Sequence, residues 1–262
     1  MGKKYGQGIT REFGLNNKQL KEPIFKKMKQ LFFLFYAIIF ATSICISQTP
    51  RNYFDESIKV DSKNIPFNRK QFYFPVKLFP KVEMNWEQMN DSVTSATPKI
   101  YTNEIDSIHL TWFSRFLYDM KEPLLFNRQL NKQVFRFTWL RTFHNPVMVR
   151  IEKGNNGVFL YWKVTDGKGG YDPGKIMVNE KRKIINPEWE QFISLVDSAK
   201  FWKMTRSGIV GMDGSEWILE GIDPTRYYVT SAWSPNKTSS FYKVGDFLLG
   251  LTDLNIEEGD KY

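Results

Sequence analysis

Apolar residues recur every three or four positions in three stretches of the chain, and this spacing predicts three helices that each bury one side. The first stretch covers residues 103–123, where Asn103 is placed to cap the start. The second begins at Asn186, which is placed to cap its start, and the third carries its apolar stripe from Phe241 to Leu251.

Between the first two helices, apolar and polar residues alternate in four short runs separated by Gly, Asn and Pro. These runs are 134–143, 147–154, 158–166 and 175–185. Such runs with no helix between them predict an antiparallel meander. Two more runs, at 215–221 and 226–233, predict a hairpin. The predicted fold class is therefore α+β: one antiparallel sheet, made of a four-strand meander plus a hairpin, with the helices packed on one face.

Residues 48–102 are only weakly patterned. Their most apolar part, QFYFPVKLFP at 71–80, contains two prolines, which favour an edge strand or an extended arm over a central strand. We therefore expect residues 48–102 to form an extended, weakly structured arm, and residues 103–262 to form the α+β domain.

Residues 28–47 are typical of a secretory signal peptide, with a positive start, an apolar run, and small residues at Cys45 and Ser47 before a plausible cut at Gln48. An uncleaved anchor and a lipoprotein modified at Cys45 remain alternatives. All three interpretations place the domain outside the cytoplasm, periplasmic or secreted. Residues 1–27 precede a second methionine, are polar and aperiodic, and are expected to be a non-native or disordered leader.

Most of the formal net charge of +9 lies near the N-terminus, because residues 1–47 hold eight Lys or Arg and two acidic residues. The rest of the chain is close to balanced, which is not typical of a nucleic-acid-binding surface. We therefore expect no nucleic-acid partner, and contact with a membrane only through the N-terminal segment.

Few residues of the chain suit cofactor or metal chemistry. Cys45 is the only cysteine, so a chain processed at Ser47 would have no disulfide, thiol nucleophile or thiolate metal site. Two histidines, His109 and His144, are too few for a histidine-rich metal site. The sequence also lacks the GxxxxGK[ST], GxGxxG and GxSxG motifs. We expect neither a cofactor nor a metal.

Four segments stand in a fixed order: RFTWLRTFHNP at 136–146, GGY at 169–171, GMDGSEWILEG at 211–221 and WSP at 233–235. This combination resembles a family of uncharacterised exported bacterial proteins with the pattern RFxWLRxFxxP, GGY, GxDGxxWxLEG and WSP. The resemblance covers about residues 133–254. It implies export and a domain boundary near residue 130, and it implies no activity.

The segment GMDGSEWILEG offers carboxylates for an acidic catalytic site at Asp213, Glu216 and Glu220. On a strand, Glu216 and Glu220 share a face at about 13 Å, which is too far apart for the carboxylate pair of a glycosidase. The alternative is structural: Asp213 closes a turn, and Trp217 faces the core while Glu216 stays exposed.

Arg141 shares a strand face with Phe137 and Trp139, so its guanidinium needs a partner if it is buried. Asp213 and Glu220 are candidate partners, and Arg141 is either part of a structural ion pair or a ligand-binding residue. His144 lies in the HNP turn, where it is either a turn residue or a base.

We therefore expect an exported, non-enzymatic binding or structural protein of the envelope or the extracellular space, with an envelope protein or a glycan as partner. The alternative is a hydrolase with an acidic site around Asp213, Glu216 and Glu220. The candidate ligand-binding residues are Arg141, His144, Asp213, Glu216 and Glu220.

Overall fold

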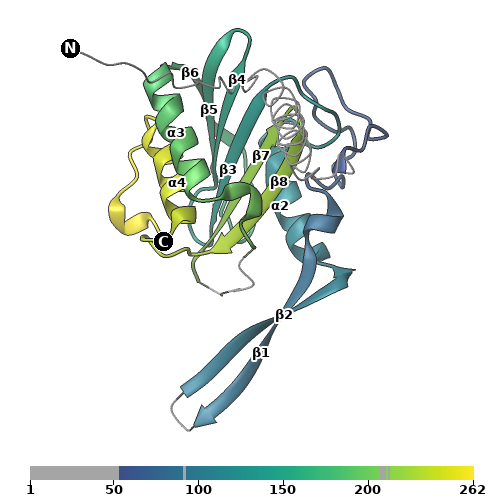
Figure 1. Ribbon diagram of the computed structural model, residues 1–262, viewed down its shortest axis with the longest axis vertical. Helices are drawn as coiled ribbons and strands as arrows, with labels where there is room; N and C mark the ends of the chain where they lie inside the picture. The colour runs from purple at the N-terminus through teal and green to yellow at the C-terminus, as the bar shows by residue number, and fades with distance from the viewer. Residues whose placement is uncertain (1–52, 91–92, 207–210, 212) are drawn as a thin grey trace, which may run out of the picture. The chain divides into compact units, whose positions relative to one another are not determined.

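The structure is a computed structural model, and it describes residues 53–90, 93–206, 211 and 213–262 (Figure 1). The chain divides into two compact units, residues 1–48 and 49–262. The predicted leader at 1–27 and signal peptide at 28–47 lie outside the described residues. None of the described helices is both long enough and apolar enough to span a membrane.

The α+β class is confirmed, since the described residues form antiparallel sheets and three α-helices. Six strands form one sheet in the order β6-β5-β4-β3-β7-β8 (Figure 1). Their bounds are β3 Gln133–Arg141, β4 Val147–Gly154, β5 Gly157–Thr165, β6 Ile176–Ile184, β7 Ser215–Asp223 and β8 Arg226–Trp233. A separate two-stranded sheet pairs β1 (Pro80–Asn90) with β2 (Val93–Ile105).

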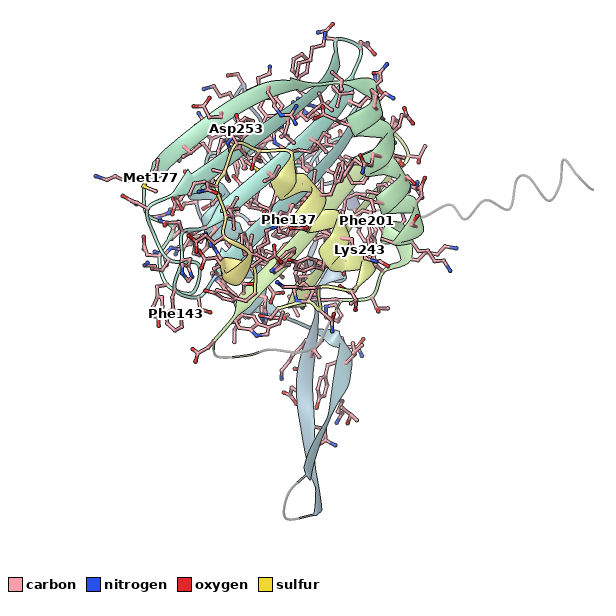
Figure 2. The ribbon with its side chains drawn as sticks, turned by 90° about the vertical axis from the view of Figure 1, so that its left-hand side faces the viewer. Phe137, Phe143, Met177, Phe201, Lys243 and Asp253 are labelled. Carbon is pink, nitrogen blue, oxygen red and sulfur yellow. The ribbon has the colours of Figure 1, made fainter. Side chains whose placement is uncertain are left out.

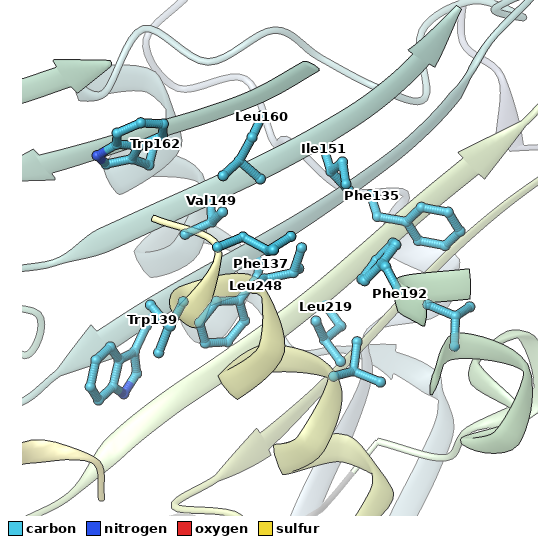
Figure 3. Packing of buried hydrophobic residues seen from close by; sticks show 14 of the residues in the cluster. Phe135, Phe137, Trp139, Val149, Ile151, Leu160, Trp162, Phe192, Leu219 and Leu248 are labelled. Carbon is cyan, nitrogen blue, oxygen red and sulfur yellow. The ribbon is translucent and has the colours of Figure 1, made fainter. Parts of the chain in front are cut away.

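Helices α3 (Asn186–Ser198) and α4 (Ser240–Gly250) cover one face of the six-stranded sheet (Figure 3). Alternate residues of β3 enter this core, among them Phe137 and Trp139, because successive side chains of a strand point to opposite faces. α4 lies close to the sheet at Gly245, where a Cβ atom would come within 2.7 Å of the Trp217 ring. Burial of each large side chain here contributes about 1.5–3 kcal/mol.

Helix α2 (Ser107–Asp119) packs on the opposite face, together with residues 53–79. This second core joins Phe113 of α2 to the other alternate positions of the strands, such as Leu140 and Ile218. The prediction of helices on one face is thus not confirmed. The strands carry an apolar set on each face, and pattern alone does not assign each helix to its face.

Part of the expected arm, residues 48–102, is packed into this second core. Tyr73 is fully buried; its backbone N–H donates to the Ser114 hydroxyl at 2.9 Å, and its own hydroxyl donates to the Glu122 carbonyl at 2.9 Å. The prolines of the 71–80 segment flank a short 3₁₀ turn, Val76–Leu78, and do not interrupt a strand. Packing of the α+β unit therefore begins well before residue 103, and the expected domain start there is corrected.

Two predicted helix caps are also corrected. α2 begins at Ser107, and the Asp106 carboxylate accepts the His109 backbone N–H at 3.1 Å, so Asp106 and not Asn103 is the cap. Residue Ile185 is the N-cap of α3, where the Glu188 carboxylate accepts its backbone N–H at 3.0 Å.

Candidate functional site

The segments that carry the resemblance meet at one end of the six-stranded sheet, which we call the motif end: residues 141–146, 169–171, 214–215 and 233–235. The Thr142 N–H donates to the Gly214 carbonyl at 2.9 Å, and the Ser234 N–H donates to the Ser215 carbonyl at 2.7 Å. A Cβ atom on Gly169 would lie 2.4 Å from the Arg141 backbone, so only glycine permits this approach. The motif glycine at 169 therefore has a packing role.

Arg141 lies at the motif end without a carboxylate partner among the described residues. Its guanidinium sits 4.3 Å from the centre of the Trp139 ring and donates to the Asn145 carbonyl at 3.0 Å. Burial lowers the pKa of Arg141, opposed by Tyr262 and Asp260. The prediction that Asp213 or Glu220 pairs with Arg141 is wrong, because a ring face and a backbone carbonyl take the partner's place.

His144 is half-buried at the motif end, and its Nδ1 lies 2.5 Å from the Tyr262 hydroxyl. The Tyr262 backbone oxygen also accepts the Trp217 indole N–H at 3.2 Å. His144 thus contacts the last residues of the chain, and this contact favours a structural role over that of a base. Phe143 lies beyond the end of β3 and is 47% exposed (Figure 2).

Asp213 is exposed in the loop before β7. Within the part of the chain that the structure describes, its carboxylate makes no hydrogen bond or ion pair. It lies at the same end of the sheet as Arg141 without pairing with it. Neither the predicted turn closure nor a catalytic partner is therefore found for Asp213 among these residues.

Glu216 is buried, with 3% of its surface exposed, so the prediction that it stays exposed is wrong. All nine residues of β7 are buried, because α2 and its neighbours cover the face that Glu216 shares with Ile218. Burial raises the pKa of Glu216 to about 7, opposed by a hydrogen bond with Ser231 and by the positive charge of Arg206.

Beside Glu216 lies a compact polar cluster built on Asp106. The Asp106 carboxylate is 2.7 Å from His109 Nδ1 and accepts from Arg206 Nη1 at 2.8 Å. Arg206 Nε donates to the Ser231 hydroxyl at 3.1 Å. Burial alone would raise the pKa of Asp106, but the bonds from His109 and Arg206 bring it down to about 2. Asp106 is therefore an ionised carboxylate that His109 and Arg206 hold in place at the start of α2.

Glu220 is fully enclosed in a different part of the sheet. Arg136 lies opposite it in the β3–β7 register and donates from Nε at 2.8 Å, and the Tyr227 hydroxyl donates at 2.6 Å. Burial raises the pKa of Glu220, opposed by Arg136 and Tyr227. The structure thus does not bring Glu220 together with Asp213 or Glu216.

Glu122, a residue that the sequence did not single out, is fully buried between three cations. Its carboxylate is 2.8 Å from Arg150 Nε, 2.8 Å from Lys163 Nζ and 3.7 Å from Arg136 Nη1. Burial would raise the pKa of Glu122, but Arg150, Lys163 and Arg136 lower it. Glu122 therefore fixes the positions of Arg150 and Lys163 through ion pairs from the protein interior.

Arg150 and Lys163 line a pocket of about 830 Å³. We call it the basic pocket, after its six cationic lining residues: Lys63, Lys121, Arg128, Lys132, Arg150 and Lys163. Two acidic residues, Asp61 and Glu152, also line it. Its walls come from residues 61–65, 121–132 and three neighbouring strands, so no single motif in the sequence marks it.

No protein-family model matches the chain, and comparison with curated proteins finds no match. The resemblance to an exported family therefore rests on the motif residues alone. Across the described residues, no three His, Cys, Asp or Glu side chains are grouped so that they could hold a metal ion.

Proposed function

We propose that this chain is an exported domain that binds a ligand of the envelope or the extracellular space without converting it, and that the basic pocket is its binding site. The observation that carries the proposal is the pocket itself. Its volume of about 830 Å³ falls within the range of about 300–1,000 Å³ that is usual for ligand sites. We propose that the pocket is built on the predicted four-strand meander, β3 to β6, because these strands hold Arg150 and Lys163 rigidly.

The positions of the carboxylates support binding over hydrolysis. Glu220 is engaged by Arg136 and Tyr227, Glu216 is enclosed beneath α2, and Asp213 is exposed on its loop. An acid–base pair needs two carboxyl groups that reach one substrate bond. The hydrolase alternative around these three residues therefore has less support than a binding role.

A binding screen with two matched variants tests the proposal. Asn179→Trp places a large ring in the pocket from the exposed strand β6, whereas Glu180→Trp makes the same change on the opposite face of that strand. The full chain would be screened against envelope glycans and peptides, with mass spectrometry of each bound compound afterwards. We expect binding that Asn179→Trp abolishes and Glu180→Trp keeps, and bound compounds of unchanged mass. A cleaved product that Glu216→Gln abolishes would establish the hydrolase instead.

Export is a separate part of the proposal, supported by the signal-like composition of residues 28–47. Mass spectrometry of the protein recovered outside the cytoplasm should find an N-terminus at or near Gln48. An intact Met1 in that sample would contradict a cleaved signal peptide.

A further inference from the structure

The basic pocket opens onto the half of the sheet that α2 leaves uncovered. The second core draws its strand residues from β3, β4, β7 and β8, and none of them comes from β5 or β6. On β5, Phe159 and Tyr161 point to this same side and are only half-buried, while their neighbour Leu160 faces the other core. A ligand in the pocket can therefore extend along β5 and β6.

Cations cover the aromatic rings on this open surface. Arg150 lies 4.4 Å from the centre of the Tyr161 ring, and Lys181 Nζ lies 4.2 Å from that of Phe159 and 5.0 Å from that of Tyr161. The register places Lys181 directly opposite Tyr161 on β6. Ring contacts hold Lys181 at the surface without neutralising its charge, whereas Arg150 is also paired with Glu122.

Both acidic residues that line the pocket already have partners within the protein. Glu152 pairs with Arg150 and, at 2.5 Å, with Lys132. The Asp61 carboxylate accepts the backbone N–H groups of Lys63 at 2.9 Å and Ile65 at 2.8 Å. Together with Glu122, Glu152 pairs with Lys132, Arg150 and Lys163, so three of the six lining cations keep no carboxylate partner among the described residues.

Three cations at the rim, Lys63, Lys121 and Arg128, are exposed and pair with no carboxylate among the described residues. The pocket also lowers the pKa of Lys132, first by burial and then by the charge of Arg150, with Arg128 adding to it. Like charges that crowd one pocket repel each other, and an anion bound among them relieves that repulsion.

We infer that the ligand of the basic pocket is a polyanionic saccharide whose carboxylate or phosphate groups meet the cations at its rim and floor. This inference rests on the proposed binding function and adds the chemical class of the ligand. Ser62 and Asn179, both exposed in the lining, offer uncharged hydrogen-bonding groups for sugar hydroxyls. A single-stranded nucleic acid is the less suitable occupant, because cations already lie over the Phe159 and Tyr161 rings on which bases would stack.

Isothermal titration of the full chain against four probes tests the inference. The probes are hexagalacturonate, its full methyl ester, a phosphorylated pentamannose and a single-stranded dT hexamer. We expect the two charged saccharides to bind, and the methyl ester to bind at least about tenfold more weakly, since it keeps the backbone and loses the charge. Raising sodium chloride from 50 to 500 mM should weaken the charged saccharides, because salt screens exposed charges.

Charge reversals locate the site. Lys121→Glu and Arg128→Glu change exposed rim residues, whereas Lys243→Glu makes the same change on the outer side of α4 (Figure 2). Each rim variant should weaken hexagalacturonate about tenfold, and the α4 variant should leave it unchanged. Melting curves that match the parent protein show that a variant remains folded.

Tighter binding of the phosphorylated sugar than of hexagalacturonate supports the inference with phosphate as the recognised group. Equal binding of hexagalacturonate and its ester, unaffected by Arg128→Glu, would overturn the inference and leave the proposed binding function intact. Tighter binding of the dT hexamer than of both charged saccharides would also overturn it. If none of the probes binds, the inference is also overturned. The proposed function would still be supported if a neutral ligand binds the parent protein and Asn179→Trp abolishes that binding.

Discussion

Glu216→Gln should make the protein less sensitive to pH between about 4 and 8. Burial raises the pKa of Glu216 from 4.5 to about 7 in the folded protein. The unfolded chain then releases this proton near pH 4.5, while the folded protein keeps it until about pH 7. Stability therefore falls as the pH rises through this window, and the loss is complete above it.

The size of this effect follows from the pKa shift, which corresponds to about 3 kcal/mol. Glutamine occupies the same space and cannot ionise, so the variant avoids that loss. Urea unfolding of both proteins at several pH values measures the difference in the free energy of unfolding. We expect the variant to gain about 3 kcal/mol over the parent between pH 4 and pH 8.

The titration of the neighbouring Asp106 does not affect this comparison of parent and variant. Asp106, with its pKa lowered from 3.8 to about 2, titrates below this pH window in both proteins. A difference between variant and parent that stays flat within about 0.5 kcal/mol from pH 4 to pH 8 would refute a buried, protonated Glu216.

Three further variants test the packing and the ion pairs by urea unfolding. Trp217→Ala should cost about 3–5 kcal/mol, because this ring is fully buried between sheet and helix, and a loss below about 1 kcal/mol would contradict that position. Arg136→Ala should cost about 3–5 kcal/mol because it leaves Glu220 buried without its partner, whereas Arg136→Met combined with Glu220→Leu should cost much less; equal losses would refute the pairing. Asp213→Asn should stay within about 0.5 kcal/mol and keep ligand binding, and lost binding would make Asp213 a ligand contact.

The elements of the sheet could be predicted because their alternation is strong. The run at 226–233 matches β8, Arg226–Trp233, and the run at 134–143 differs from β3 by one or two residues at each end. Each strand keeps its period of two even where both faces are buried. The sequence pattern therefore locates these strands without showing what covers them.

The second covered face could not be predicted, because charged residues on it resemble a solvent face. Arg136 and Glu220 each stand between apolar neighbours, which suggests an exposed side. Only the β3–β7 register places one opposite the other and turns two isolated charges into a buried pair. For the same reason Glu216 was expected in solvent and is found under α2.

The candidate site was predicted only in part. Arg141 is buried near Trp139 as its alternation indicates, but the expected carboxylate partner is replaced by the indole ring and the Asn145 carbonyl. The basic pocket lay beyond sequence reasoning, because cations such as Lys63, Arg128 and Lys163 come from segments far apart in the chain. The near-balanced charge of the chain after residue 47 also conceals a local excess of cations, which only their positions in space reveal.

Hydrogen–deuterium exchange of the full chain, with and without hexagalacturonate, shows directly whether the ligand occupies the basic pocket. Bound ligand slows exchange where it covers or stiffens the backbone. We expect protection in peptides that cover residues 61–65, 121–132 and 148–163, and unchanged exchange in α3 and α4. Protection confined to the motif end, at residues 141–146 and 169–171, would contradict the basic pocket as the binding site.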